Sequence, residues 1–162
     1  MSFGITRTAQ ASWSGTVAEG GGRLGLGSGA FEGPFTLKAR VEEGQPSANP
    51  EELIGAALAG CFTMSLADKL SEAGHPPTEL RTTARVRLEQ RPEGFRITRI
   101  TLSTEGEVPG VDDAQFQELA EAASVCPISL ALAGTEIAHE ARLIYGTPYW
   151  GAVSSPSWTY RR

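Results

Sequence analysis

Apolar and polar side chains alternate in several short stretches of the chain, and this spacing is typical of strands with one buried face. One stretch is glycine-rich, follows the Gly20-Gly21-Gly22 turn, and is predicted to be an edge strand with loose register. A turn at Arg91–Gly94 joins two of the predicted strands into a hairpin. The segments predicted as strands are 6–13, 23–29 (the glycine-rich one), 35–41, 80–88, 95–103 and 137–144.

A long helix is predicted from Asn49 to about Ala73. Asn49 is a favourable N-cap, a proline follows at the first helical position, and Glu51 and Glu52 complement the positive end of the helix dipole. Because residues 53–67 are apolar or small on nearly every side, we expect this helix to be buried on most of its faces.

Two further helical segments are predicted after the hairpin. Asp112, with Gln115 three residues later, starts the first, and Pro127 separates it from a short segment at 128–133 that Gly134 ends. Strands, helix, hairpin, helices and a last strand follow one another without a sustained strand–helix–strand repeat. The order therefore predicts an α+β fold with antiparallel sheet.

The composition limits the kinds of protein that this chain can be. The 162 residues are enough for one compact domain, and a content of 40% hydrophobic and 20% charged residues permits a real core. The net charge of −5 argues against a nucleic-acid or anionic-membrane partner, since phosphate binding needs a basic surface. No apolar run approaches the roughly 20 residues of a membrane span. The first residues lack the pattern of a signal peptide, so we expect a cytoplasmic protein.

The segment 145–162 differs in kind from the rest of the chain. It contains all three tyrosines and two of the three tryptophans, Trp150 and Trp158, among Gly, Pro and Ser. We therefore divide the chain into a domain at 1–144 and an aromatic C-terminal extension. Aromatic side chains at this density usually pack on something. We expect the extension to pack on its own domain, to cover a partner subunit or to close over a pocket.

Two cysteines are the main candidates for chemistry. Cys61 lies in the middle of the apolar helix, and Cys126 directly precedes Pro127, where the dipole of a short helix favours a thiolate. Taken singly, each is most simply a structural thiol. His75 and His139 have no ligand-like spacing, so no zinc site is predicted. Together the thiols can close a disulfide across a core. An activated thiol would attack a peroxide O–O bond, become a sulfenic acid and condense with the other.

Two motifs resemble those of a known family. Asn49–Ala57 is NPEELIGAA and Ala59–Met64 is AGCFTM, and together they closely resemble the signature of the OsmC/Ohr family, the osmotically inducible and organic-hydroperoxide-resistance proteins. Val125–Ser129, VCPIS, resembles the family's second motif. The resemblance covers roughly residues 8–143 and is closer to the OsmC branch than to the Ohr branch. It implies antiparallel sheets packed around central buried helices in an intertwined homodimer, with active sites at the interface.

The resemblance also implies an activity: a thiol peroxidase that reduces organic hydroperoxides, and hydrogen peroxide less well, to alcohols. By position, Cys61 is then the peroxidatic thiol and Cys126 the resolving thiol. Glu51 is the acidic residue that orients an arginine. In the OsmC branch this arginine is Arg40, on the strand before the signature, and in Ohr proteins it corresponds to Arg23; we prefer Arg40. No metal, haem or flavin is implied, and the implied reductant is a dithiol such as dihydrolipoamide on a lipoylated protein.

These residue types suit that chemistry. An apolar environment raises the pKa of a thiol, whereas a nearby arginine favours the thiolate and binds the peroxide oxygen as charge develops there. A carboxylate is needed to hold a buried arginine. Without the resemblance, Glu51 is explained by the helix dipole alone and Arg40 by a solvated strand face. Leu58, Phe62 and Met64 are expected to give an apolar lining for alkyl or lipid-derived hydroperoxides.

The spacing of Glu51 and Cys61 sets a geometric condition. On one helix they are separated by about 15 Å along the axis, so they cannot share a site within a straight helix of one chain. Either the helix bends at its start, or each site takes its glutamate from a second subunit.

A competing hypothesis from another class is a non-catalytic redox sensor or hydrophobic-ligand-binding protein on the same dimer fold. A sensor would be oxidised once per thiol, whereas an enzyme would turn over when a dithiol is supplied.

Overall fold

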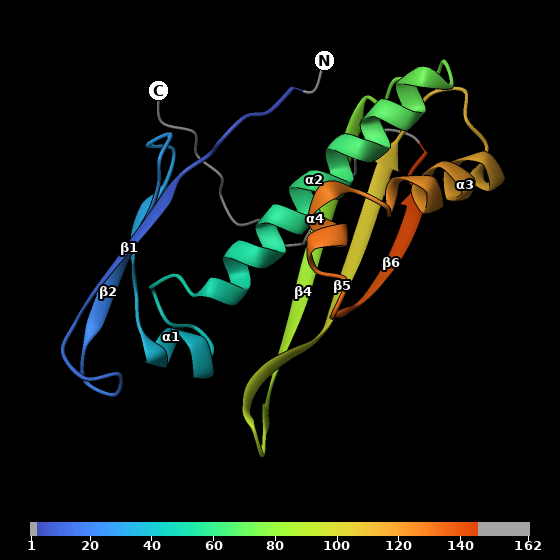
Figure 1. Ribbon diagram of the computed structural model, residues 1–162. Helices are drawn as coiled ribbons and strands as arrows, with labels where there is room; N and C mark the ends of the chain where they lie inside the picture. Colours follow the sequence, from blue (N-terminus) through green and yellow to red (C-terminus); the bar gives the residue numbers. More distant parts are fainter. Residues whose placement is uncertain (1–2, 146–162) are drawn as a thin grey trace.

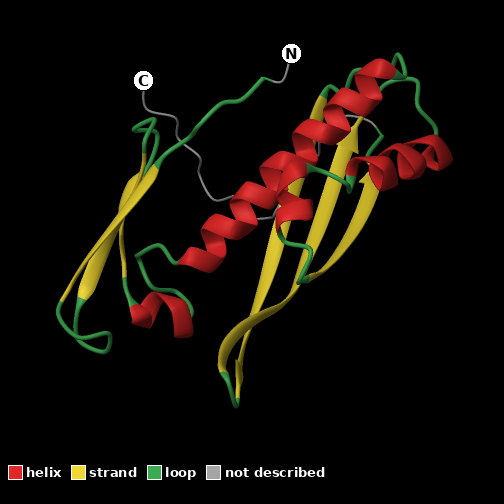
Figure 2. Cartoon of the chain, in the orientation of Figure 1, coloured by secondary structure: helices red, strands yellow, loops and turns green. Residues whose placement is uncertain are grey.

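In the computed structural model, which describes residues 3–145, the chain forms two three-stranded sheets and a long helix that packs on the second sheet (Figure 1, Figure 2). This confirms the predicted α+β class. The predicted C-terminal extension, apart from Tyr145, lies outside the described residues, so the domain boundary stays a prediction. In chain order the elements are β1 (Ala9–Ser14), β2 (Gly21–Leu26), β3 (Glu32–Phe35), α1 (Leu37–Val41), α2 (Pro50–Glu72), β4 (Glu79–Arg91), β5 (Gly94–Glu107), α3 (Asp113–Ala123), α4 (Pro127–Ala131) and β6 (Glu136–Leu143).

The first sheet has the order β1-β2-β3 with antiparallel neighbours, so β2 is its central strand and not the predicted edge strand. The glycines of β2 allow close contact between strands. A Cβ atom at Gly22 would lie 2.2 Å from the carbonyl oxygen of Ser12 and 2.4 Å from the ring of Phe35. Gly22 therefore lets β2 lie against β1 while the Phe35 side chain covers it.

Residues 35–41 do not form the strand that their alternation predicts. The strand β3 ends at Phe35, and the short helix α1 follows. Thr36 is the N-cap of α1, and its hydroxyl accepts a hydrogen bond from the N–H of Ala39 at 3.1 Å. Since Leu, Lys, Ala and Arg all favour a helix, the capped helical turn wins over the alternation in so short a segment. Arg40 consequently lies on a helix and not on a strand.

The helix α2 begins and ends close to where the sequence predicts. The Asn49 side chain accepts the N–H of Glu52 at 2.8 Å, and the helix ends before Gly74, which has a φ of 85°. One face of α2 packs on β4 and β5. Its opposite face is exposed, so the expected burial on most faces is wrong for the single chain. The buried residues are Glu51, Gly55, Leu58, Phe62, Leu66 and Leu70, and the exposed face includes Ala56, Ala57, Gly60 and Met64.

By length and composition, α2 is also apolar enough to cross a membrane, with a mean hydropathy of 1.4. The expectation that no apolar run approaches a membrane span was therefore too strict. The core helix of a water-soluble protein passes the same test, and 33% of the apolar window is already buried inside the described chain. One such helix is weak evidence for a membrane span.

The second sheet has the order β4-β5-β6. The strands β4 and β5 form the predicted hairpin, but β5 and β6 run parallel, which corrects the expectation of an antiparallel sheet. The reason is the connection between them. The helices α3 and α4 cross from the end of β5 back to the start of β6, and such a crossover joins parallel strands. The core lies between this sheet and the helices α2 and α3, and includes Phe62, Ile100, Leu102 and Phe116.

Candidate active site

The two thiols meet inside the second half of the fold. Cys61 lies in the middle of α2 and is partly exposed, whereas Cys126 directly precedes α4 and is buried. Both cysteines are free, and their side chains lie close enough that each shifts the pKa of the other. Contact between α2 and α4 brings these distant residues together. The pair is therefore placed for thiol–disulfide chemistry.

Cys126 is held by the first turn of α4. Its backbone N–H donates to Oγ of Ser129 at 2.9 Å, and the same hydroxyl donates to the Cys126 carbonyl oxygen at 2.8 Å. The Ser129 N–H in turn points at the Cys126 sulfur, which completes a capping box. Sequence reasoning gave Ser129 no role. A residue with a hydroxyl three positions after a helix N-cap is the signal that would have found it.

The surroundings act differently on the two thiols. Burial raises the pKa of the Cys61 thiol, and the hydrogen bond and charge of Cys126 raise it further. At Cys126 burial also acts to raise the pKa, but hydrogen bonds from Cys61, Ser129 and Ile128 outweigh burial and lower the pKa of this thiol below its usual value. Within one chain, therefore, the surroundings favour the thiolate at Cys126 and disfavour it at Cys61.

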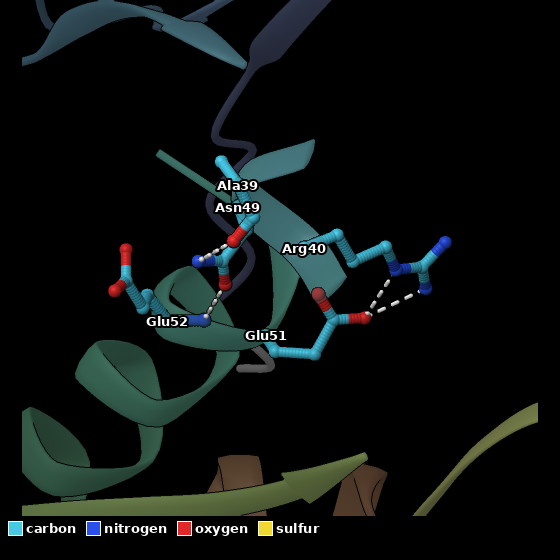
Figure 3. A network of polar contacts seen from close by, with 5 residues as sticks. All are labelled: Ala39, Arg40, Asn49, Glu51 and Glu52. Atoms are coloured by element: carbon cyan, nitrogen blue, oxygen red, sulfur yellow. Dashed lines mark hydrogen bonds and ion pairs between the residues drawn. The ribbon is translucent and has the colours of Figure 1, made fainter. Parts of the chain in front are cut away.

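A second cluster of polar residues lies at the start of α2 (Figure 3). Arg40 donates from Nε and from one terminal nitrogen to Oε1 of Glu51, at 2.8 and 2.6 Å. The Glu51 side chain is only 9% exposed and that of Arg40 is 37% exposed. The Asn49 amide donates to the Ala39 carbonyl oxygen at 3.2 Å, which ties α1 to the start of α2. The predicted Arg40–Glu51 pair is thus present, although Arg40 comes from a helix.

The surroundings of this ion pair leave room for further contacts. The Arg40 guanidinium carbon lies 6.0 Å from the ring centroid of Phe95, a residue that sequence reasoning did not single out. The second carboxylate oxygen of Glu51, Oε2, is buried and has no hydrogen-bond partner among the described residues.

Arg23, the alternative to Arg40, lies in a different environment. Its Nε donates to Oε1 of Glu32 at 2.9 Å, across the strands β2 and β3. Both side chains are mostly exposed, at 60% and 61%. An exposed ion pair of this kind contributes little to stability, and it does not involve Glu51, which pairs with Arg40. Arg40, and not Arg23, therefore pairs with Glu51, and the role of Arg40 beside the thiol stays a prediction.

The thiol pair and the ion pair are separate within one chain. Glu51 is the second residue of a continuous helix, so no bend at the helix start brings it to Cys61. The separation along the axis is about 15 Å, as the spacing predicts. One chain thus carries two polar clusters, which the fold keeps at different levels of α2.

A groove of about 990 Å³ lies beside the exposed face of α2. Arg40, Glu51, Gly60 and Met64 are among its lining residues, together with the loop after α1 and the strand β4. Leu58 and Phe62, the other predicted substrate-lining residues, face the core instead and are each 1% exposed. The three residues therefore do not form one surface.

Leu58 and Phe62 border a smaller cavity of about 210 Å³, which Ser129, Glu121 and His139 also line. His139 lies 3.2 Å from the Glu121 carboxylate, through Nε2 and Oε2. Within residues 3–145, no three or more His, Cys, Asp or Glu side chains are grouped so that they could hold a metal ion.

Two facing thiols in an α+β core, one of them at a helix start, are the arrangement of a dithiol redox protein. A family model described as OsmC-like protein matches residues 42–140. The chain therefore belongs to the OsmC-like family, as its two motifs predict.

Individual relatives agree with this assignment. The protein named Peroxiredoxin OsmC from Escherichia coli strain K12 is 42% identical over 130 residues, which cover 79% of this chain and 90% of that protein. Among solved structures, the organic hydroperoxide resistance protein OhrB of Bacillus subtilis is 27% identical, with a TM-score of 0.66 over 83% of this chain and 98% of that one. An organic hydroperoxide resistance protein from Elizabethkingia anophelis is also 27% identical, with a TM-score of 0.68 over 88% and 98% of the two chains.

Proposed function

We propose that the chain is a cysteine-based thiol peroxidase that reduces organic hydroperoxides, and hydrogen peroxide less well, to alcohols. The observation that carries the proposal is the proximity of the Cys61 and Cys126 side chains across the contact of α2 and α4, because it puts a second thiol within reach of the first after oxidation. The names of the relatives, a peroxiredoxin and organic hydroperoxide resistance proteins, support the same reaction class.

The reaction proceeds in two steps with Cys61 as nucleophile. The Cys61 thiolate attacks the outer oxygen of the hydroperoxide, the O–O bond breaks, and the alkoxide leaves as the alcohol after taking up a proton. Cys61 is then a sulfenic acid. The Cys126 thiolate attacks the Cys61 sulfur, hydroxide leaves, and a Cys61–Cys126 disulfide forms. A dithiol such as dihydrolipoamide on a lipoylated protein returns the disulfide to two thiols.

The activating residues Arg40 and Glu51 are assigned to a second copy of the chain. Because the contacts within one chain raise the pKa of Cys61, a positive charge beside its sulfur is needed to make Cys61 the thiolate. Arg40 of the same chain pairs with Glu51 at the start of α2, and Glu51 is about 15 Å from Cys61 along the helix axis. A homodimer in which Arg40 and Glu51 of one subunit face Cys61 of the other supplies that charge. Their location beside the groove along the exposed face of α2 supports this arrangement.

The remaining assignments follow from the same proposal. The apolar end of an alkyl or lipid-derived hydroperoxide contacts Met64 in the groove, while Leu58 and Phe62 support the thiol pair from the core side of α2. The cytoplasm is the assigned compartment, because two free thiols without a structural disulfide persist in a reducing environment.

The test is the consumption of cumene hydroperoxide with dihydrolipoamide as reductant, for the wild type and for Cys61→Ser and Cys126→Ser. We expect multiple turnovers in the wild type and none in Cys61→Ser. In Cys126→Ser we expect one equivalent of oxidation, which leaves a trappable sulfenic acid at Cys61. A wild type that is oxidised once per thiol and does not turn over when the dithiol is present would overturn the enzyme and favour a redox sensor.

A further inference from the structure

Met64 is the only methionine among residues 3–145, and it lies on the exposed face of α2. It is 75% exposed and lines the groove of about 990 Å³ together with Gly60. Methionine is usually found in a core, where its flexible thioether fills irregular gaps. Here the sulfur is instead open to whatever enters the groove, and a thioether is a group that peroxides oxidise.

The position of Met64 on the helix brings its thioether close to the peroxidatic thiol. Long side chains on a helix lean toward its N-terminus, so Met64 covers the turn that holds Gly60 and Cys61. Residues three apart on a helix have Cβ atoms about 5–6 Å apart, and Cys61 is partly exposed. A Cβ atom at Gly60 would meet nothing within 4 Å, so this position leaves open space on the same face. A hydroperoxide that reaches Cys61 therefore passes the Met64 sulfur.

The two sulfurs compete for the same oxidant under the proposed function. A thiolate is the stronger nucleophile, so Cys61 reacts first while the thiols are reduced. Once Cys61 and Cys126 form a disulfide, a hydroperoxide in the groove meets only the thioether. The Met64 sulfur attacks the outer oxygen and the O–O bond breaks. The hydroperoxide proton moves to the departing oxygen, so that one sulfoxide and one alcohol form and the sulfur is oxidised by two electrons.

We propose that Met64 is a regulatory modification site, which an organic hydroperoxide oxidises to the sulfoxide when the dithiol reductant runs short. This inference rests on the proposed peroxidase function and deepens it, because the change regulates the same site. The sulfoxide is polar, and it takes the place of the apolar side chain that contacts the hydrocarbon end of the substrate. Activity toward organic hydroperoxides therefore falls. Methionine sulfoxide reductases reverse the oxidation, so the change is a switch.

The first test measures the oxidation itself. Wild-type protein is treated with cumene hydroperoxide, with dihydrolipoamide in excess or omitted, and N-acetylmethionine in the same tube is the reference thioether. Fragmentation of the peptide that contains Met64 and Cys61 locates each added oxygen by mass. With excess dithiol we expect Met64 to stay unoxidised until the dithiol is consumed. Without it, Met64 should be oxidised about tenfold or more faster than N-acetylmethionine, because the groove holds the oxidant beside it.

The second test measures the effect on activity after the disulfide has been reduced again. Each protein is compared with its own untreated sample, and Met64→Leu is the matched control, because leucine is apolar, similar in volume and not oxidised. We expect kcat/KM of oxidised wild type to fall about tenfold for cumene hydroperoxide and to change little for hydrogen peroxide, since one apolar contact discriminates by that order. The treated Met64→Leu protein should keep its own value. Met64→Gln should show the low ratio of cumene hydroperoxide to hydrogen peroxide activity without treatment.

The outcomes differ for the two claims. A protein that reduces no peroxide and still shows the fast oxidation of Met64 would refute the peroxidase and keep the modification site. Oxidation of Met64 at the rate of N-acetylmethionine would overturn the inference and leave the peroxidase intact. An equal loss of activity in treated wild type and treated Met64→Leu would also overturn it, because the loss would then come from further oxidation of Cys61.

Discussion

The division of the active site between two chains can be tested with a mixed dimer. One subunit carries Cys61→Ser and the other carries Arg40→Gln, and each of these variants alone should be inactive. In the mixed dimer, Cys61 of the Arg40→Gln subunit faces Arg40 of the Cys61→Ser subunit. That site is complete, whereas the second site lacks both groups.

The magnitude follows from the distance between the two clusters. At an effective dielectric constant of 20, a unit positive charge about 15 Å from the Cys61 sulfur stabilises the thiolate by about 1 kcal/mol, against about 4 kcal/mol at 4 Å. The first value corresponds to a pKa shift of less than one unit, and the negative charge of Glu51 cancels most of that shift. Arg40 of a second chain at the shorter distance would offset the burial that raises the pKa of Cys61.

The assay is the rate of cumene hydroperoxide reduction by mixed dimers purified through two different affinity tags. We expect about half of the wild-type rate per dimer, because one of the sites related by the two-fold axis is intact. In the matched control, the second subunit carries Arg23→Gln in place of Arg40→Gln. Arg23 pairs with Glu32 in an exposed ion pair, so the Arg23→Gln variant should be active on its own. A mixed dimer as inactive as its parents would refute the reasoning, since Arg40 and Cys61 would then act within one chain.

Three further predictions concern the residues that position the site. The variant Ser129→Ala should raise the pKa of Cys126, because a hydrogen bond that favours its thiolate is lost. A thiolate whose pKa is lowered by folding adds stability that is lost as the pH falls through the folded pKa, so the difference in stability between the variant and wild type should grow as the pH rises toward the pKa of an unfolded thiol. Thiolate absorbance measures the pKa, and urea unfolding at several pH values measures the stability. A stability difference that does not depend on pH would contradict the role of Ser129. The variant Gly106→Ala should lower the free energy of unfolding by about 1–3 kcal/mol, because its Cβ would come within 3.0 Å of two core side chains. The control in urea unfolding is Gly134→Ala, whose Cβ would meet nothing within 4 Å. Equal stabilities of the two variants would contradict the packing. The variant Asn49→Asp keeps the N-cap of α2 and loses the hydrogen bond from the side-chain amide to α1, so it should unfold like wild type and react more slowly with peroxide. The variant Asn49→Ala should also lose about 1 kcal/mol of stability, because it removes the N-cap.

Local signals explain why some of the fold was predictable. The start of α2 depends on residues that are neighbours in the sequence, with an N-cap, a proline and two acids in one run, and the structure confirms it. The segment 35–41 gave a wrong prediction because so few residues fit either a strand or a short helix, and the bond from Ala39 to the Thr36 hydroxyl decides between them. The parallel pairing of β6 was missed although the long helical connection after β5 indicates a crossover.

The candidate site was less predictable from local pattern. No spacing rule brings Cys61 and Cys126 together, because their contact depends on the packing of α2 against α4. The family motifs supplied that pairing.

The fold divides nucleophile and activator between the two ends of α2, and this division has a chemical consequence under the proposed function. In one chain the hydrogen bonds at the start of α4 lower the pKa of Cys126, whereas burial and Cys126 raise the pKa of Cys61. In the proposed homodimer, Arg40 of the second chain lies beside Cys61 and favours the thiolate at the sulfur that attacks the peroxide.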